Sequence, residues 1–383
     1  MLRRRSYSVY TLSIILLFLF AVAMPAGATS DTERIERLER ELKELKKGVA
    51  EAEAEGEEVR HKLGLIGRAV DVSGYADVEL ILTDQKEQNN RFRVRHLSLF
   101  FTKEIVKGWK LFTEIEYEDA PLFRANTGAD TVNTAQGDVY VEQMYVEYRR
   151  SLDLDFRVGR VLTPAGIWSI YHYPPYVPTQ SNPIMYKLLF PKVSDGLQVR
   201  KSFTINDSPL DTHLYVANGA GNPGRLDRNG NKAIGGRINY SIDLLDGLDL
   251  GGSFYGERDN DDIRRATYGA HLLLNLDRLS LQSEYAVRHN SPPGSGTDYD
   301  DKGLYAQLTY HKDRWGFTGR YDWFDENNTL STGDRYRYTG AVNYNIAHNL
   351  VGKAELSRNN FDDPATDDYN ELIFAIVVAI GDL

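Results

Sequence analysis

Ten basic side chains fall on alternate positions of segments whose composition favours β-strands, so each shares a strand face with other polar residues. They are Arg93, Arg95, Arg157, Arg200, Arg237, Arg288, Arg320, Arg335, Arg337 and Lys353. Basic side chains that line a water-filled passage attract anions and repel cations. We therefore expect these residues to line a pore and to act on the charge of a passing solute rather than on its covalent bonds.

Acidic side chains occupy the same predicted faces. They are Glu114, Glu116, Glu147, Glu284, Asp322 and Glu355. Strand parity alone does not show how the two signs are arranged in space. Two arrangements stay open, namely a mixed solvated wall and a transverse field with arginines on one wall and carboxylates on the other.

The chain offers little for catalysis or for cofactor binding. Residues 219–224 match the letters of a dinucleotide fingerprint, but they separate two predicted antiparallel strands and open no helix. The eight histidines lack metal-ligand spacing, there is no cysteine, and no nucleophile elbow or HExxH motif occurs. We expect no enzyme activity, no cofactor and no metal site in the pore.

Acidic residues also cluster in predicted outer loops. The clusters are Asp259, Asp261 and Asp262; Asp298, Asp300 and Asp301; and Asp362, Asp363, Asp367 and Asp368. Such carboxylates could hold divalent cations that bridge lipopolysaccharide phosphates. Simple solvation of polar loops is the alternative.

One connection, residues 162–194, is too long for an ordinary loop. It holds six of the thirteen prolines and seven aromatic or histidine side chains, Trp168, Tyr171, His172, Tyr173, Tyr176, Tyr186 and Phe190. Because so apolar a segment is poorly solvated, we expect it to fold into the lumen and narrow it. The expected constriction residues are Trp168, Tyr173, Tyr176, Lys187 and Lys192. A cap outside the barrel is the alternative.

Apolar and polar side chains alternate from residue 69 onward, as where Trp109 and Ile115 oppose Glu114 and Glu116. The pattern predicts strands near 70–83, 90–103, 109–118, 138–149, 152–161, 195–205, 211–218, 233–243, 248–257, 264–275, 279–289, 302–312, 315–324, 334–345, 350–358 and 369–380. An even number of such strands, with long and short connections in turn, predicts an all-β, sixteen-stranded antiparallel transmembrane β-barrel over residues 69–383. A soluble β-sandwich is the alternative.

One strand breaks the alternation. A regular strand would place Arg91, Arg93 and Arg95 on the same face as Leu97 and Leu99, because all five positions are odd-numbered. One face cannot suit both the arginines and the leucines. We therefore predict a β-bulge near His96.

The N-terminus carries two further predicted segments. Residues 1–28 combine three arginines, an apolar stretch and small residues before position 28, as in a secretory signal peptide; a signal anchor is the alternative. Residues 31–67 show apolar heptad spacing, which predicts an α-helical coiled-coil stalk in the periplasm. A single amphipathic helix is the alternative, and the core positions do not choose between two and three chains.

The bulk composition narrows the class of protein. Formal net charge is −10, which disfavours nucleic acid as a partner. Mean hydropathy is −0.45, too low for a helical membrane protein but ordinary for a barrel wall that alternates.

Several motifs in residues 90–260 carry a family resemblance. They include Phe92-Arg93-Val94-Arg95, Val158-Gly159-Arg160, Thr163-Pro164-Ala165-Gly166 and Ser194-Asp195-Gly196-Leu197-Gln198-Val199. In this order they resemble the phosphate-selective porin O and P family. The resemblance implies a trimeric outer-membrane porin of sixteen strands with an inward third loop. It also extends to trimeric solute channels with an N-terminal periplasmic coiled coil.

These observations predict an outer-membrane porin for passive diffusion of small, anionic, hydrophilic solutes. Its expected partners are the outer membrane with its lipopolysaccharide, two further copies of the chain, and the solutes. The main alternative is a structural outer-membrane protein that tethers the envelope through its coiled coil. A membrane-embedded hydrolase is a weaker one, because no catalytic constellation supports it.

Overall fold

The computed structural model describes residues 70–120, 123–125, 132–134, 137–219, 230–242, 247–294 and 296–381. All of them belong to one compact unit, Gly67–Leu383. The predicted signal peptide, 1–28, and the predicted stalk, 31–67, lie outside the described residues. Within the described ranges, no helix has the length and apolar character needed to cross a bilayer.

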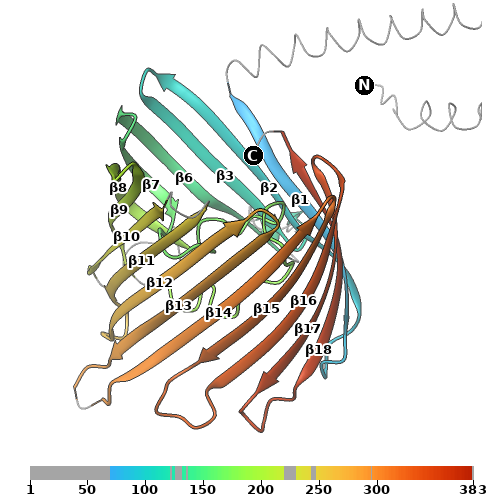
Figure 1. Ribbon diagram of the computed structural model, residues 1–383. Helices are drawn as coiled ribbons and strands as arrows, with labels where there is room; N and C mark the ends of the chain where they lie inside the picture. The colour runs from blue at the N-terminus through green and yellow to red at the C-terminus, as the bar shows by residue number, and fades with distance from the viewer. Residues whose placement is uncertain are drawn as a thin grey trace, which may run out of the picture. The chain divides into compact units, whose positions relative to one another are not determined.

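Sixteen of the described strands close into one antiparallel barrel, in which consecutive barrel strands pair and β1 pairs with β18 (Figure 1). They are β1 (Asp71–Thr83), β2 (Arg91–Val106), β3 (Trp109–Glu118), β6 (Asp138–Ser151), β7 (Leu154–Leu162), β8 (Val193–Ile205), β9 (Ser208–Asn218), β10 (Lys232–Ile242), β11 (Leu248–Arg258), β12 (Arg264–Leu276), β13 (Leu279–Ser291), β14 (Tyr299–Lys312), β15 (Trp315–Asp325), β16 (Asp334–Ala347), β17 (Leu350–Phe361) and β18 (Tyr369–Ile380). The predicted number and antiparallel order of barrel strands are confirmed.

A small hairpin was not expected from the sequence. Strands β4 (Phe123–Ala125) and β5 (Val132–Thr134) form a separate two-stranded sheet in the connection between β3 and β6. Three residues are too few for an alternating pattern to be recognised, so the sequence carries no clear signal for it.

The two ends of the barrel differ in their connections. Tight turns join β2 to β3, β6 to β7, β8 to β9, β12 to β13, β14 to β15 and β16 to β17 at one end, the short-turn end. Asp277 and Asp313 adopt left-handed backbone conformations there, with φ of 40° and 54°, which aspartate tolerates better than most residues. Longer connections gather at the other end, the long-loop end.

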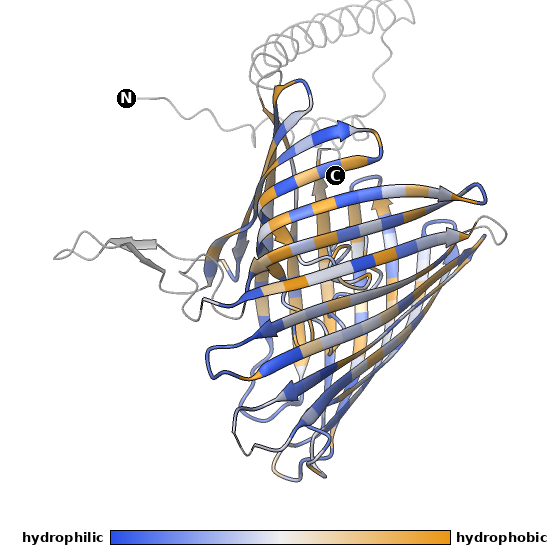
Figure 2. Cartoon of the chain, turned by 90° about the vertical axis from the view of Figure 1, so that its left-hand side faces the viewer, coloured by the Kyte–Doolittle hydropathy of each residue, from blue (hydrophilic) through white to orange (hydrophobic). Residues whose placement is uncertain are grey.

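The barrel is apolar outside and polar inside. Trp315 and Phe317 on β15 are 45% and 43% exposed, whereas Thr318 and Arg320, which follow on the same strand, are buried. Figure 2 shows the same alternation as bands of opposite hydropathy along the strands. Side chains of this kind on the outer face suit contact with hydrocarbon, so the pattern is that of a transmembrane wall rather than a soluble sandwich.

The predicted bulge in β2 is confirmed. The register against β1 moves from Asp77 opposite His96 to Val78 opposite Val94, which leaves Arg95 as the extra residue. Odd-numbered side chains point inward before the bulge and even-numbered ones after it, since Val94 is half exposed on the outside while Ser98 is fully buried inside. Both sets of residues thereby reach a suitable face.

Gly159 on β7 supplies a test of the register between β6 and β7. Its φ is +131°, and a Cβ there would overlap the backbone carbonyl oxygen of Met144 on β6. We expect Gly159→Ala to destabilise the barrel by about 2 kcal/mol or more, because it adds both strain and a backbone clash. Urea titration of the folded barrel, followed by heat-modifiable gel migration, measures the loss. Gly340→Ala is the matched control, since a Cβ at Gly340 meets nothing within 4 Å; equal destabilisation by both variants would refute the register.

Candidate functional site

The connection between β7 and β8, residues 163–192, lies within the barrel and is termed the inner loop. Its backbone amides donate to side chains on widely separated strands. The N–H of Gly166 donates to Ser253 Oγ on β11 at 3.0 Å, and that of Trp168 donates to Glu284 Oε1 on β13 at 2.7 Å. That of Gln180 donates to Glu355 Oε2 on β17 at 2.6 Å. The inner loop therefore crosses the lumen.

Arg320 on β15 makes the densest attachment to the inner loop. Its guanidinium donates to Thr179 Oγ1 at 2.5 Å, to the Ser181 carbonyl at 2.9 Å and to Ser181 Oγ at 2.8 Å. It also pairs with Asp322 at 2.9 Å and lies 5.6 Å from the ring centroid of Trp168. A planar cation with five donors is suited to holding several loop acceptors at once.

Lys353 and Arg237 hold the inner loop in the same way. Lys353 Nζ donates to the carbonyls of Pro174 and Val177 at 2.8 and 2.6 Å, and Arg237 Nε donates to that of Gly166 at 2.9 Å. These two residues and Arg320 are only 3–7% exposed. The sequence predicted that all three line open water. The structure instead places them against the loop, because loop carbonyls inside a barrel need donors.

Aromatic side chains of the inner loop fill the space beneath it. Trp168 is buried and packs edge-to-face on Tyr305 of β14, with ring centroids 6.1 Å apart. Tyr173 packs on Phe100 of β2 at 5.4 Å. Tyr176, by contrast, is 56% exposed. A cluster of buried apolar residues joins the loop to the inner wall, and it includes Trp168, Met185, Leu189, Tyr255, Tyr305 and Phe324.

The two lysines of the inner loop have different surroundings. Lys187 is exposed, with its ammonium over the ring of Tyr186. Lys192 Nζ pairs with Glu142 on β6 and lies 3.5 Å from Glu116 Oε2 on β3. Burial alone would lower the pKa of Lys192, but these carboxylates raise it above its ordinary value. Lys192 is therefore a positive partner for buried carboxylates rather than a free charge in the passage.

A hollow of about 420 Å³ at the long-loop end, the arginine hollow, gathers four of the predicted basic residues. Arg93, Arg95, Arg335 and Arg337 line it together with Arg91, and its lining acids are Glu79 and Glu371. Five arginines against two glutamates give these residues a net charge of +3. Ser181, Asn182 and Tyr186 of the inner loop form part of the same lining.

The arginines of this hollow are oriented by neighbouring groups. Arg95 donates to the Gln180 carbonyl at 2.8 Å and pairs with Glu79 at 3.3 Å. Arg93 pairs with the same glutamate at 3.1 Å and with Asp119. Arg337 pairs with Asp322 at 3.3 Å. Glu79 and Asp322 are each shared between two arginines, whereas Asp119 binds Arg93 through both of its oxygens. Because a guanidinium has five N–H donors, these acids do not use all the donors of the arginines that line the hollow.

Two further hollows have an excess of acidic residues in their lining. One of about 270 Å³ at the short-turn end includes Arg200, Lys201 and Arg237 but also Asp153, Asp155, Asp211 and Asp249. Arg200 pairs there with Asp155 at 2.8 Å. Arg157 pairs with Glu147, also at 2.8 Å. The predicted basic residues are thus split between the two ends of the lumen.

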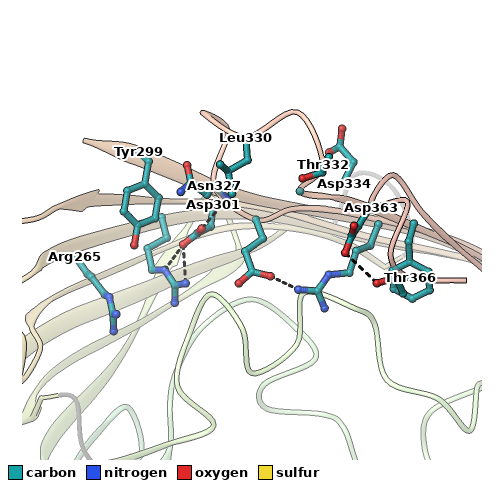
Figure 3. A pocket seen from close by; sticks show the side chains of 14 residues that line it. Arg265, Tyr299, Asp301, Asn327, Leu330, Thr332, Asp334, Asp363 and Thr366 are labelled. Carbon is teal, nitrogen blue, oxygen red and sulfur yellow. Dashed lines mark hydrogen bonds and ion pairs between the residues drawn. The ribbon is translucent and has the colours of Figure 1, made fainter. Parts of the chain in front are cut away.

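A third hollow, of about 560 Å³, opens among the loops beyond β12 to β17. Figure 3 shows Arg265, Tyr299 and Asp301 on one side of it and Asp363 with Thr366 on the other. Arg288 pairs with Asp301 at 2.6 Å, and Arg335 pairs with Glu326. Four acids against three arginines leave its lining with a net charge of −1.

The acidic outer-loop residues make local contacts. Asp259 accepts the N–H groups of Asp261 and Ile263 at 2.9 Å and pairs with Arg265 at 2.7 Å. Asp363 Oδ1 accepts the N–H of Ala365, also at 2.9 Å. These contacts stabilise loop turns without requiring a cation.

Comparison with known proteins places the chain among outer-membrane barrels. Residues 72–379 match the family described as "Putative beta-barrel porin-2, OmpL-like". An uncharacterized protein of Aquifex aeolicus (strain VF5) is 26% identical over 221 residues, covering 52% of this chain and 47% of that protein. This chain thus spans about half the length of the curated relative that it matches.

Two solved structures illustrate the shared fold. An anion-selective porin from Comamonas acidovorans superposes with a TM-score of 0.60 at 12% identity, over 81% of this chain and 99% of that one. The trimer form of OmpT, an outer membrane protein of Vibrio cholerae, gives 0.56 at 13% identity, over the same shares of both chains. At these identities the likeness concerns the fold.

Removing the Arg320 anchor tests the role of the inner loop. We expect Arg320→Met to loosen residues 179–182 and to cost about 3 kcal/mol, because it leaves buried loop acceptors without donors. Single-channel recordings should then show larger and noisier conductance. Arg358→Met, which removes an exposed arginine paired with Asp368 on an outer loop, should leave the stability and the conductance unchanged. An Arg320→Met channel that is quiet and of unaltered conductance would contradict the role of this anchor.

Proposed function

The chain belongs to the β-barrel porin-2, OmpL-like, family, and on that premise we propose that it is a bacterial outer-membrane channel through which small, anionic, hydrophilic solutes diffuse passively. The barrel interior carries the passage, and the inner loop narrows it. The described residues offer positioned charges and donors for transient solute contacts, which suits transport rather than bond making.

The arginine hollow is the observation that supports a preference for anions. It lies on the inner wall beside the inner loop, and its lining has a net charge of +3, whereas the hollow at the short-turn end and the one among the loops beyond β12 to β17 each have −1. Guanidinium groups bind carboxylates and phosphates through paired hydrogen bonds. A solute that passes the inner loop on this side exchanges water for arginine donors, so an anion is favoured over a cation.

The kind of anion is a finer part of the proposal. The motif resemblance favours phosphate, and the solved anion-selective porin of Comamonas acidovorans shows that the fold can serve anions in general. In this chain the basic groups closest to the passage come mainly from the barrel wall, since Lys192 of the loop is already paired with Glu142. We therefore propose small anions as the class.

The remaining parts of the proposal concern assembly and placement. We propose a homotrimer, in keeping with the trimer form of the Vibrio cholerae barrel. The short-turn end would face the periplasm with the stalk of residues 31–67, and the long-loop end would meet lipopolysaccharide. Divalent cations at the acidic outer loops stay part of the proposal, and two of the aspartates there, Asp259 and Asp363, already accept hydrogen bonds from loop N–H groups.

Neutralising the arginine hollow tests the anion preference. We expect the double variant Arg93→Gln and Arg95→Gln to lower the chloride-to-potassium permeability ratio by about sixteenfold for each charge removed, because ~0.8 kcal/mol between two unit charges about 5 Å apart in water changes the local chloride and potassium concentrations about fourfold each, in opposite directions. Reversal potentials under a potassium chloride gradient measure this ratio. Low ionic strength is needed because salt screens the effect.

A control variant distinguishes the effect of a charge inside the lumen from that of a charge elsewhere on the protein. Arg358→Gln removes an arginine whose side chain is exposed and paired with Asp368, and it should leave the permeability ratio unchanged. A wild-type channel that prefers cations, or a double variant with the wild-type ratio, would exclude the arginine hollow as the selective element. Absence of any stepwise conductance would exclude the channel itself.

A further inference from the structure

Apolar side chains lie beside the guanidinium groups of the arginine hollow. Leu188 and Ile184 of the inner loop and Phe361 at the end of β17 belong to its lining. Leu188 is 36% exposed, and Ile184 and Phe361 are half-buried. The interior of a channel-forming barrel is normally polar because it meets water. Apolar surface beside five arginines is therefore unusual in such a passage, and it points to a solute that has both kinds of surface.

The inner wall contributes apolar residues to the same hollow. Ile81 on β1 and Ile373 on β18 are partners in the strand register, and both belong to its lining. Arg91 on β2 is the register partner of Ile81 on the other side, so a guanidinium and two isoleucines stand in one row across three strands. Each isoleucine is only 3–4% exposed, so they lie behind the more exposed Leu188. Cationic and apolar groups are thus adjacent in this hollow.

Two aromatic rings add a flat surface to the lining. The rings of Phe361 on β17 and Tyr369 on β18 are stacked, with centroids 6.0 Å apart and an interplanar angle of 24°. Both residues line the hollow, and both are half-buried. Aromatic rings attract a further ring by stacking or by edge contacts, and a guanidinium group stacks on aromatic faces as well. The hollow, at about 420 Å³, has the size of a binding site for a small molecule.

We propose that the arginine hollow takes organic carboxylates with a single-ring apolar body, the class of benzoate. This inference rests on the proposed channel function and names its substrate more narrowly. The carboxylate accepts paired hydrogen bonds from an arginine, while the ring covers the apolar surface of Leu188 and its neighbours and removes both surfaces from water. Inorganic anions have no apolar surface, so they gain only the first interaction. An uncharged aromatic solute gains only the second.

Block of the chloride current by benzoate tests this inference. Acetate is the matched probe, because it carries the same charged group without the ring. The full chain is reconstituted in planar bilayers in potassium chloride at neutral pH, and either anion is added in increasing concentration. We expect benzoate to halve the conductance at a concentration about tenfold below that of acetate, because covering apolar surface adds to its affinity.

Two variants separate the apolar from the ionic contribution. Leu188→Asn removes apolar surface but keeps the backbone carbonyl that accepts from Arg288. It should raise the half-blocking concentration of benzoate about fivefold and leave that of acetate unchanged. Arg91→Gln removes an exposed guanidinium of the hollow, so it should weaken block by both anions to the same extent. The matched control is Ile170→Asn, which changes a half-buried isoleucine of the inner loop at the short-turn hollow and should alter neither concentration.

The failure of this inference is distinct from the failure of the proposed function. Equal half-blocking concentrations for benzoate and acetate, in a channel that prefers chloride over potassium, would overturn the inference and leave the proposed function standing. Unchanged benzoate block in Leu188→Asn would do the same, as would an equal loss of block in Ile170→Asn. Absence of conductance would overturn the proposed channel, and the inference with it.

Discussion

A closed barrel of sixteen strands encloses more space than its own inward side chains can fill, and this constraint shapes the rest of the molecule. The inner loop occupies that space, but it brings backbone groups that must be hydrogen-bonded away from bulk water. The wall meets this need with charged side chains. Arg320, Lys353 and Glu355 each bind loop backbone atoms, so much of the buried charge in the barrel belongs to positioning the loop.

Charged residues on the inner wall consequently have two roles, which are to hold the inner loop and to line the arginine hollow. Arg320 and Lys353 touch the loop backbone and are buried against it, whereas Arg95 both donates to the Gln180 carbonyl and lines the arginine hollow. Those farther toward the long-loop end, such as Arg93 and Arg335, stay partly exposed beside a hollow. On the proposed function, the residues that line the hollow would give the passage its charge, while those that hold the loop would set its width. Mutations could therefore change the ion selectivity of the passage without changing its width.

The sequence predicts the wall better than it predicts the interior. Alternation of side chains reports faces directly, so the strands, their number and the bulge beside His96 follow from it. Proline and aromatic content likewise marks residues 162–194 as a segment that needs burial. The alternation of side chains shows which arginines point inward, but not which of them contact a loop carbonyl and which contact water. That depends on where the loop crosses each strand. Arg237 and Arg320 were assigned to open lumen for this reason.

Contacts between distant segments are the part that no local pattern contains. Glu142 escaped notice because β6 reaches β3 only across a long connection that includes the β4–β5 hairpin. His172 looked isolated because Glu142, the carboxylate beside it, comes from another strand and is thirty residues away in the chain. Glu114 and Glu116 on one strand face were the available hint, and the third carboxylate, from another strand, could not be placed from it.

The bulge in β2 has a consequence for how this barrel can vary over generations. In a regular strand, loss of one residue turns every following side chain to the wrong face. Loss of Arg95 would instead restore a regular ladder, since the residues on either side already have matching orientations about it. The chain could thus gain or discard one positive charge in its interior through a single-codon deletion or insertion, with the wall left intact.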